Sequence, residues 1–221
     1  MQASYMQRIR DICFDVLYAN THHVPDEIPS IGITDNWSYY GSGDNEIGIN
    51  RHSVHRWDDY FEETAHALRY SSIVYQSGID QLQHTIVDEF FGGLGRMIGR
   101  MSISENYRHS APQMQWHHIT AFDKTRHTVR SPSQWRAHLL QSIERHTENR
   151  SQFKTQEIAR TVAIGHCLGY LMAENYPIPS PPTTALHQLF ELADSEVWEY
   201  VFPSIRRRSP ALHAAWLETF I

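Results

Sequence analysis

The sequence predicts an α+β fold that is mostly α-helical and contains one small antiparallel β-sheet. Three observations favour this class. Apolar residues recur at helical spacing through much of the 221-residue chain. Short β-prone segments, broken by turn residues, are confined to residues 31–50. The content of 41% hydrophobic and 20% charged residues is typical of a globular protein, so the chain can build an ordinary core.

The first 50 residues predict one helix followed by the sheet. Ile9, Cys13 and Leu17 share a face of an amphipathic helix expected over residues 3–20. The turn signals Asp35-Asn36 and Gly41-Ser-Gly-Asp-Asn separate β-prone segments. The three expected strands therefore occupy residues 31–34, 37–40 and 46–50.

The rest of the chain predicts further helices. Ser53 is the expected N-cap of a helix that ends near Tyr70. The small sheet is expected to pack on this helix. Residues 105–131 are polar and histidine-rich, which favours a long loop or an insertion. The other expected helices occupy residues 79–101, 133–146, 155–175, 184–192 and 194–206.

The chain is expected to divide into a domain of residues 1–176 and a C-terminal segment of residues 177–221. The segment begins with a proline-rich run, residues 177–182, which favours a stiff extended linker. Its two helices are expected to pack on the same domain or on a partner. Apolar residues near the end, including Trp216 and Phe220, could also join copies of the chain or a larger particle.

The most informative motif is Glu62-Glu63-Thr64-Ala65-His66. Residues four apart lie on the same helix face, so Glu62 and His66 can bind one metal ion. Glu63 stands where a general base would take a proton from a metal-bound water. Glu89, preceded by Asp88, lies on the next predicted helix and is the third candidate ligand.

This arrangement resembles the gluzincin branch of the zincin-like zinc metallopeptidases, whose motif is H-E-x-x-H. The resemblance covers roughly residues 30–175 and includes the order of edge strand, motif helix and acidic helix. The segment Gly165-His-Cys-Leu-Gly-Tyr is similar to a supporting helix of small members. The resemblance implies a minimal zincin-like domain, a metal-dependent hydrolase acting on a peptide or protein, Glu63 as base, and His66 and Glu89 as ligands.

Glu62 is the departure from the family pattern, because it replaces the first histidine. A set of one histidine and two carboxylates is harder and more anionic than two histidines and one carboxylate. It should bind zinc less tightly and accept manganese, iron or magnesium more readily. It would also make the metal a weaker Lewis acid, so weak or absent peptidase activity is one expectation. An oxyanion-stabilising donor could come from Tyr107, His109, His117 or His118.

Of two alternatives to a metal-dependent peptidase, the sequence favours an inactive scaffold over a di-iron protein. An inactive zincin scaffold that serves as a binding or assembly protein suits the missing histidine and the apolar tail. A ferritin-like di-iron site needs a second E-x-x-H, and the sequence contains none.

Other polar and sulfur-containing residues are expected to have structural roles. His84 and Asp88 are expected to form a helix-surface pair, and Cys13 and Cys167 are expected to be buried thiols. Loop histidines such as His22-His23 lack metal spacing on a helix and are expected at the surface.

Charge and hydropathy narrow the class of partner. The net charge of −6 disfavours a nucleic-acid-binding surface, which requires clustered Lys and Arg. No run of about 18 apolar residues is present, so no membrane span is expected. The N-terminal residues lack the apolar core of a signal peptide. These features predict a cytoplasmic protein or a component of a particle assembled there.

Overall fold

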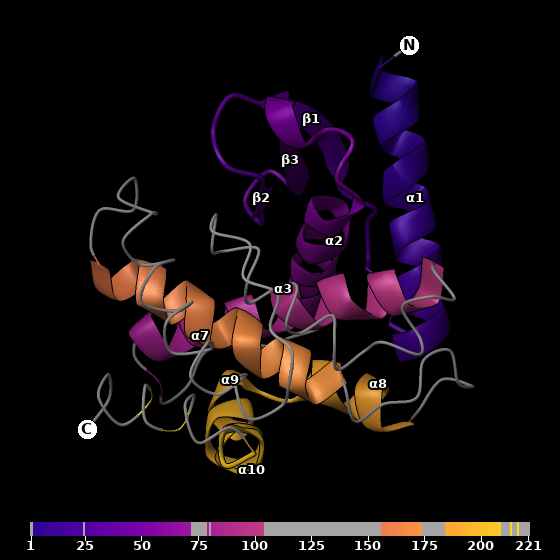
Figure 1. Ribbon diagram of the computed structural model, residues 1–221. Coiled ribbons are helices and arrows are strands. Elements are labelled where there is room, and N and C mark those ends of the chain that lie inside the picture. The colour runs from indigo at the N-terminus through magenta and orange to yellow at the C-terminus, as the bar shows by residue number, and fades with distance from the viewer. Residues whose placement is uncertain are drawn as a thin grey trace, which may run out of the picture.

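A computed structural model describes residues 2–23, 25–71, 79, 81–103, 156–173, 184–208, 213 and 216 (Figure 1). The described part is mostly helical and contains a three-stranded sheet, so the α+β class is confirmed. The long helices are α1 (Gln2–Thr21), α2 (Trp57–Ser71), α3 (Gln81–Ile103) and α7 (Gln156–Ala173). The expected helix 133–146, the loop 105–131 and the linker 177–182 lie outside the described residues.

The sheet is mixed, which corrects the antiparallel prediction. Its strands are β1 (Ser30–Thr34), β2 (Tyr39–Gly41) and β3 (Glu46–Asn50), in the order β1-β3-β2. β2 and β3 form an antiparallel hairpin with Tyr40 opposite Ile47, whereas β1 pairs parallel to β3 with Ile31 opposite Ile47. The central position of β3 is a tertiary outcome, because β-prone patterns identify strands but not their neighbours.

Helix α2 begins later than the sequence predicts. Ser53 belongs to a 3-10 turn, η1 (Arg51–Ser53), whose N-cap is Asn50. The Asn50 side chain accepts a hydrogen bond from the His52 amide at 2.8 Å. Ser53 therefore lies inside this turn and not at the N-cap position of α2, which starts at Trp57.

Helix α2 lies at the centre of the packing. It contacts α1, α3, β2 and β3, while α7 packs along α3 (Figure 1). Tyr60, Phe61 and Leu68 are fully buried, and so are Phe90 and Leu94 of α3. These side chains form one core with Cys13 and Cys167, which are free buried thiols as expected; burial raises the pKa of both thiols.

The C-terminal helices pack on this body. They are α8 (Thr184–Glu191), α9 (Asp194–Glu196), the π-helical turn η2 (Val197–Val201) and α10 (Phe202–Arg206). α8 contacts α1 and α2, and α10 contacts α7. Trp216 stacks against Trp198, with ring centroids 4.6 Å apart, and its side chain is buried.

A buried ion pair connects the C-terminal helices to α2. Asp194 accepts a hydrogen bond from Arg69 at 2.7 Å and contacts His84 Nδ1 of α3 at 2.6 Å. Arg69 also donates to the Phe190 carbonyl of α8 at 2.7 Å. The contacts of Arg69 and Asp194 join elements that are far apart in sequence.

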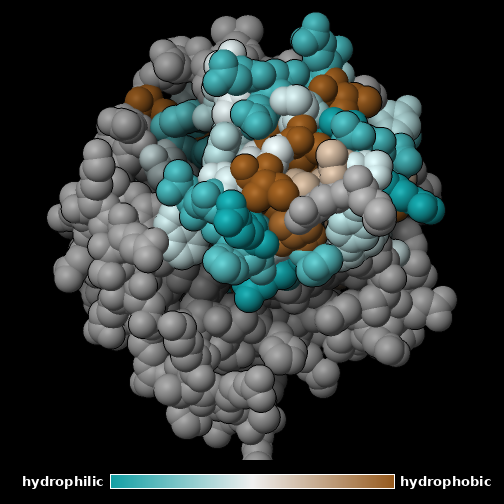
Figure 2. All heavy atoms as spheres, turned by 90° about the horizontal axis from the view of Figure 1, so that it is seen from above, coloured by the Kyte–Doolittle hydropathy of each residue, from teal (hydrophilic) through white to brown (hydrophobic). Residues whose placement is uncertain are grey.

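The outer surface at the sheet end combines polar and apolar areas. Figure 2 shows a brown apolar area there, surrounded by teal polar residues. The exposed large apolar side chains of this region include Ile28, Ile33, Trp37 and Tyr39. Within the described residues, no helix has both the length and the apolar character needed to cross a membrane.

Candidate metal centre

Helix α2 carries charged side chains into the interior of the protein. Glu62, Glu63 and His66 are 7%, 5% and 7% exposed, although such residues are usually at the surface. The helix is covered on several sides by α1, α3 and the sheet, so even its polar positions are enclosed. Buried ionisable groups require partners, and those partners define the candidate site.

The structure brings Glu62, His66 and Glu89 together. One donor atom of each residue lies within 4.8 Å of the others. Glu62 and His66 come from adjacent turns of α2, and Glu89 comes from α3, which packs directly on α2. These are the three residues that the sequence motif and the family resemblance select as ligands.

Asp88 orients the imidazole of His66. His66 Nδ1 lies 2.9 Å from Asp88 Oδ1, and because the carboxylate can only accept, Nδ1 donates and Nε2 is left for another partner. Burial alone would lower the pKa of His66, but Asp88, with contributions from Glu63 and Glu89, raises it to about 10. The members of the predicted His84–Asp88 pair also have other partners: Asp88 contacts His66, and His84 contacts Asp194. The charge of Asp88 still acts on His84.

Gly92 lets the backbone of α3 lie close to the His66 ring. A Cβ atom at this position would lie 2.6 Å from Nε2 and 3.1 Å from Glu62 Cγ. Both distances are shorter than ordinary van der Waals contact, so any larger residue would displace the ring or the carboxylate. Helix α3 thus contributes Glu89 and, one turn later, the glycine against which His66 and Glu62 pack.

His166 of α7 is a site residue that the sequence analysis did not identify. It is fully buried, and its Nε2 lies 3.1 Å from Glu62 Oε1 and 2.7 Å from Glu89 Oε2. α7 reaches this position because Gly93 lets the two helices approach; a Cβ there would lie 2.8 Å from His166 Cα. The sequence signal is a histidine between Gly165 and Gly169 in the apolar second half of the helix.

Arg96 is the second residue that the sequence did not reveal. Its guanidinium forms an ion pair with Glu62 Oε2 and lies 3.3 Å from Asp59 Oδ1. Arg96 is two turns after Glu89 on α3, so it faces the N-terminal part of α2. Its charge partly neutralises the carboxylates that α2 carries inward.

Glu63 lies beside the three converging residues. Burial raises the pKa of its carboxyl group to about 8; His66 opposes this shift, whereas Glu89, Asp59 and Asp88 add to it. The predicted base is thus within the electrostatic reach of two of the predicted ligands. The predicted oxyanion donors Tyr107, His109, His117 and His118 lie outside the described residues.

Comparison of the chain with protein-family models, curated proteins and solved structures finds no match.

Proposed function

We propose that this protein binds a divalent metal ion on Glu62, His66 and Glu89 and uses the site to hydrolyse peptide bonds. The observation that carries the proposal is the convergence of these three donors within 4.8 Å of one another, where Gly92 lets the α3 backbone lie close to His66 and Glu62. Peptide as the substrate class rests on the resemblance to the gluzincins. The proposed fold is accordingly a minimal zincin-like domain.

The charge of the site supports a bound cation. Glu62, Glu63 and Glu89 gather at one place, and two of them are nearly inaccessible to solvent. Burying several carboxylates is costly unless positive charge accompanies them, and the pairs of Arg96 with Glu62 and Asp59 and of His66 with Asp88 offset only part of that cost. A divalent ion next to Glu89 and His66 would supply the remaining compensation.

The donor set suits more than one metal. One imidazole and two carboxylates form a harder set than the two histidines and one glutamate of gluzincins, so zinc, manganese and iron are all candidate ions. His166 holds both carboxylates near one nitrogen, which fixes the positions of their oxygens. We therefore assign His166 as a positioning residue.

In the proposed hydrolysis, side chains of the protein would transfer protons and orient a metal ligand. A bound metal would supply Lewis acidity that lowers the pKa of water at the site. Glu63 would take the proton of the attacking water on its carboxylate and pass it to the leaving amine. Asp88 would keep His66 Nδ1 protonated, so that Nε2 remains the ligand atom.

Two measurements test the proposal. Protein purified without chelator should hold metal at this site, and Glu89→Gln should lose it, whereas the exposed matched control Glu199→Gln should not. Hydrolysis of an unstructured peptide library should fall at least about 100-fold in Glu63→Gln, the range typical of a general base. An unchanged rate in Glu63→Gln contradicts the catalytic proposal.

The second candidate function is an inactive scaffold for binding or assembly. The specific observation that favours it is the ion pair of Arg96 with Glu62 Oε2, because this pair already gives one predicted ligand a partner within the protein. A well-folded protein that binds no metal at Glu62, His66 and Glu89 and forms oligomers would support this candidate. Arg96→Gln would then destabilise the protein, and added zinc would not restore it.

A further inference from the structure

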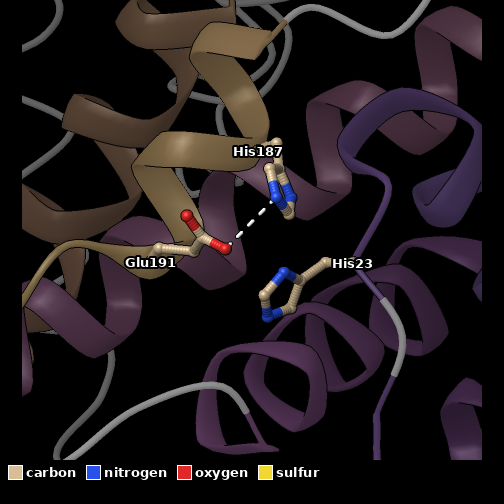
Figure 3. A group of neighbouring side chains, drawn as sticks. All are labelled: His23, His187 and Glu191. Carbon is tan, nitrogen blue, oxygen red and sulfur yellow. Dashed lines mark ion pairs between the residues drawn. The ribbon is translucent and has the colours of Figure 1, made fainter.

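A second group of potential metal ligands lies where the end of α1 meets α8. It consists of His23, His187 and Glu191, whose donor atoms all lie within 4.8 Å of one another. Figure 3 shows the two histidine side chains and the carboxylate projecting into the same space. None of these residues belongs to the candidate metal centre on α2, α3 and α7.

The chain after α1 is shaped so that His23 turns toward α8. α1 ends at Thr21, and His22 adopts a left-handed backbone conformation with φ of 55°. This conformation terminates helices and redirects the chain. The His23 amide donates to Thr21 Oγ1 at 3.2 Å, and the His23 ring lies 5.7 Å from the ring of His187. His22 is exposed, as the sequence predicts, whereas His23 is more buried and its ring lies near that of His187.

His187 presents one nitrogen to Glu191. Its Nδ1 lies 3.1 Å from the Thr21 carbonyl oxygen, and because a carbonyl can only accept, Nδ1 donates. Its Nε2 lies 3.2 Å from Glu191 Oε1, one helical turn later on the same face of α8. A carboxylate oxygen and a ring nitrogen at this distance require a proton or a metal cation between them.

The spacing suits a tetrahedral metal ion. Ligand atoms about 2.0–2.1 Å from zinc lie about 3.3 Å apart across a tetrahedral edge. The separation of His187 Nε2 and Glu191 Oε1 is close to that value. The hydrogen bond to Thr21 also provides the backbone partner that usually orients a metal-binding histidine.

We propose that His23, His187 and Glu191 form a second metal site, selective for zinc or a similar transition metal, that fastens α8 to the end of α1. Two imidazoles and one carboxylate are the donors that such ions favour. His187 is 36% exposed and Glu191 is 52% exposed, so water can complete the coordination. The site would join the N-terminal helix to the C-terminal helices of the same chain.

Zinc stoichiometry of the full chain tests the site. Equilibrium dialysis at buffered micromolar zinc should show one equivalent fewer in His187→Gln and in Glu191→Gln than in the unaltered protein. His22→Asn is the matched control, because His22 is an exposed neighbour outside the group. It should bind as much zinc as the unaltered protein.

The quantity that tests the site is the difference in zinc stoichiometry between the unaltered protein and each Gln variant, not the total amount of zinc bound. Two equivalents falling to one, or one falling to none, both support the second site, so the result does not depend on metal binding at Glu89. Zinc at about one hundred times Kd should also raise Tm by about 5 °C or more through this site. Both Gln variants should lose that increment.

Equal zinc binding by the unaltered protein, His187→Gln and Glu191→Gln would overturn the proposal. The same conclusion holds if both variants lower Tm equally with and without zinc while stoichiometry is unchanged. That outcome would show that a proton, in an imidazolium–carboxylate pair, stands between Nε2 and Oε1.

Discussion

The two histidine–carboxylate groups of this protein differ in their surroundings more than in their donors. Glu62, His66 and Glu89 lie between helices, with Glu62 and His66 almost inaccessible to solvent. His187 and Glu191 lie at the surface, on a helix near the end of the chain. In each group, the three potential ligand atoms lie within 4.8 Å of one another. The environment therefore decides what each group can do.

The first, buried group is enclosed by charged and polar neighbours, whereas His187 and Glu191 of the second, surface group are open to water. Asp88, Arg96 and His166 each contact at least one member of the buried group. These contacts balance the charges of the group and orient its side chains. Electrostatic interactions are stronger in an interior of low dielectric constant, so small displacements there change function. The surface group is solvated, and this suits a fastening role better than chemistry. Four predictions separate the two.

The largest expected effect is on folding, through Asp194. Asp194→Ala leaves the buried Arg69 guanidinium without its carboxylate, which should cost about 3–5 kcal/mol of unfolding free energy. Loosening of the C-terminal helices should also reduce zinc binding at His187 more than binding at Glu89. Urea unfolding measures the first effect, and zinc stoichiometry measures the second.

The matched control for Asp194 is Asp11→Ala, because Asp11 forms an ion pair with Arg10 while 54% exposed. Exposed pairs contribute about 0–1 kcal/mol. A loss in Asp194→Ala no larger than in Asp11→Ala would show that the buried pair does not hold the C-terminal helices in place.

The next effect concerns orientation of a ligand in the buried group. Asp88→Asn keeps the size of the side chain but removes the charge that orients His66. Loss of such a partner typically lowers metal affinity about 10–100-fold. Metal competition titration should show this loss for the buried group and none for the surface group. Asp44→Asn, in an exposed turn, should change neither affinity.

Packing beside the buried group provides a third test. Gly92→Ala places a Cβ 2.6 Å from His66 Nε2, so it should destabilise the fold by about 1–3 kcal/mol and weaken metal binding there. Gly43→Ala is the control, because a Cβ added at Gly43 would meet open space, with nothing beyond the adjoining residues within 4 Å. Unchanged metal affinity in Gly92→Ala would contradict the position of the proposed ion.

The smallest effect is a pH dependence of the link between α3 and the C-terminal helices. The hydrogen bond to Asp194 raises the pKa of His84, with help from the charges of Asp194 and Asp88 and against burial and Arg69. Burial alone would raise the pKa of Asp194, but the hydrogen bonds from His84 and Arg69 outweigh burial and lower it. His84 therefore stabilises below about pH 6.5 and Asp194 above about pH 4.

The pair should consequently contribute most between about pH 4 and 6.5. Its contribution should fall as pH rises through the raised pKa of His84, by less than about 1 kcal/mol because His84 is partly exposed. Urea unfolding with chelator present, at pH 5.5 and pH 8.5, measures it. His84→Gln should remove this part of the pH dependence; an identical dependence in both proteins would count against the link.

Local sequence patterns predicted the helices well and the sheet only partly. Apolar periodicity placed α1, α3 and α7 within a few residues of their observed ends, because helical periodicity depends on near neighbours. The parallel pairing of β1 with β3 was missed, since strand order depends on contacts between distant segments. The start of α2 was misplaced because residues 51–53 form a separate 3-10 turn, which places Ser53 before α2 and not at its first residue.

The sequence by itself determined that Glu62, Glu63 and His66 share a helix and that Glu89 follows on the next one, because these relations are set by spacing of 3.6 residues per turn. Only the tertiary structure decided that His166 and Arg96 join them and that His23 meets His187. Those contacts depend on how α3 packs on α7 and α8 on α1, and helix packing is determined by side-chain shape across the whole core rather than by local spacing.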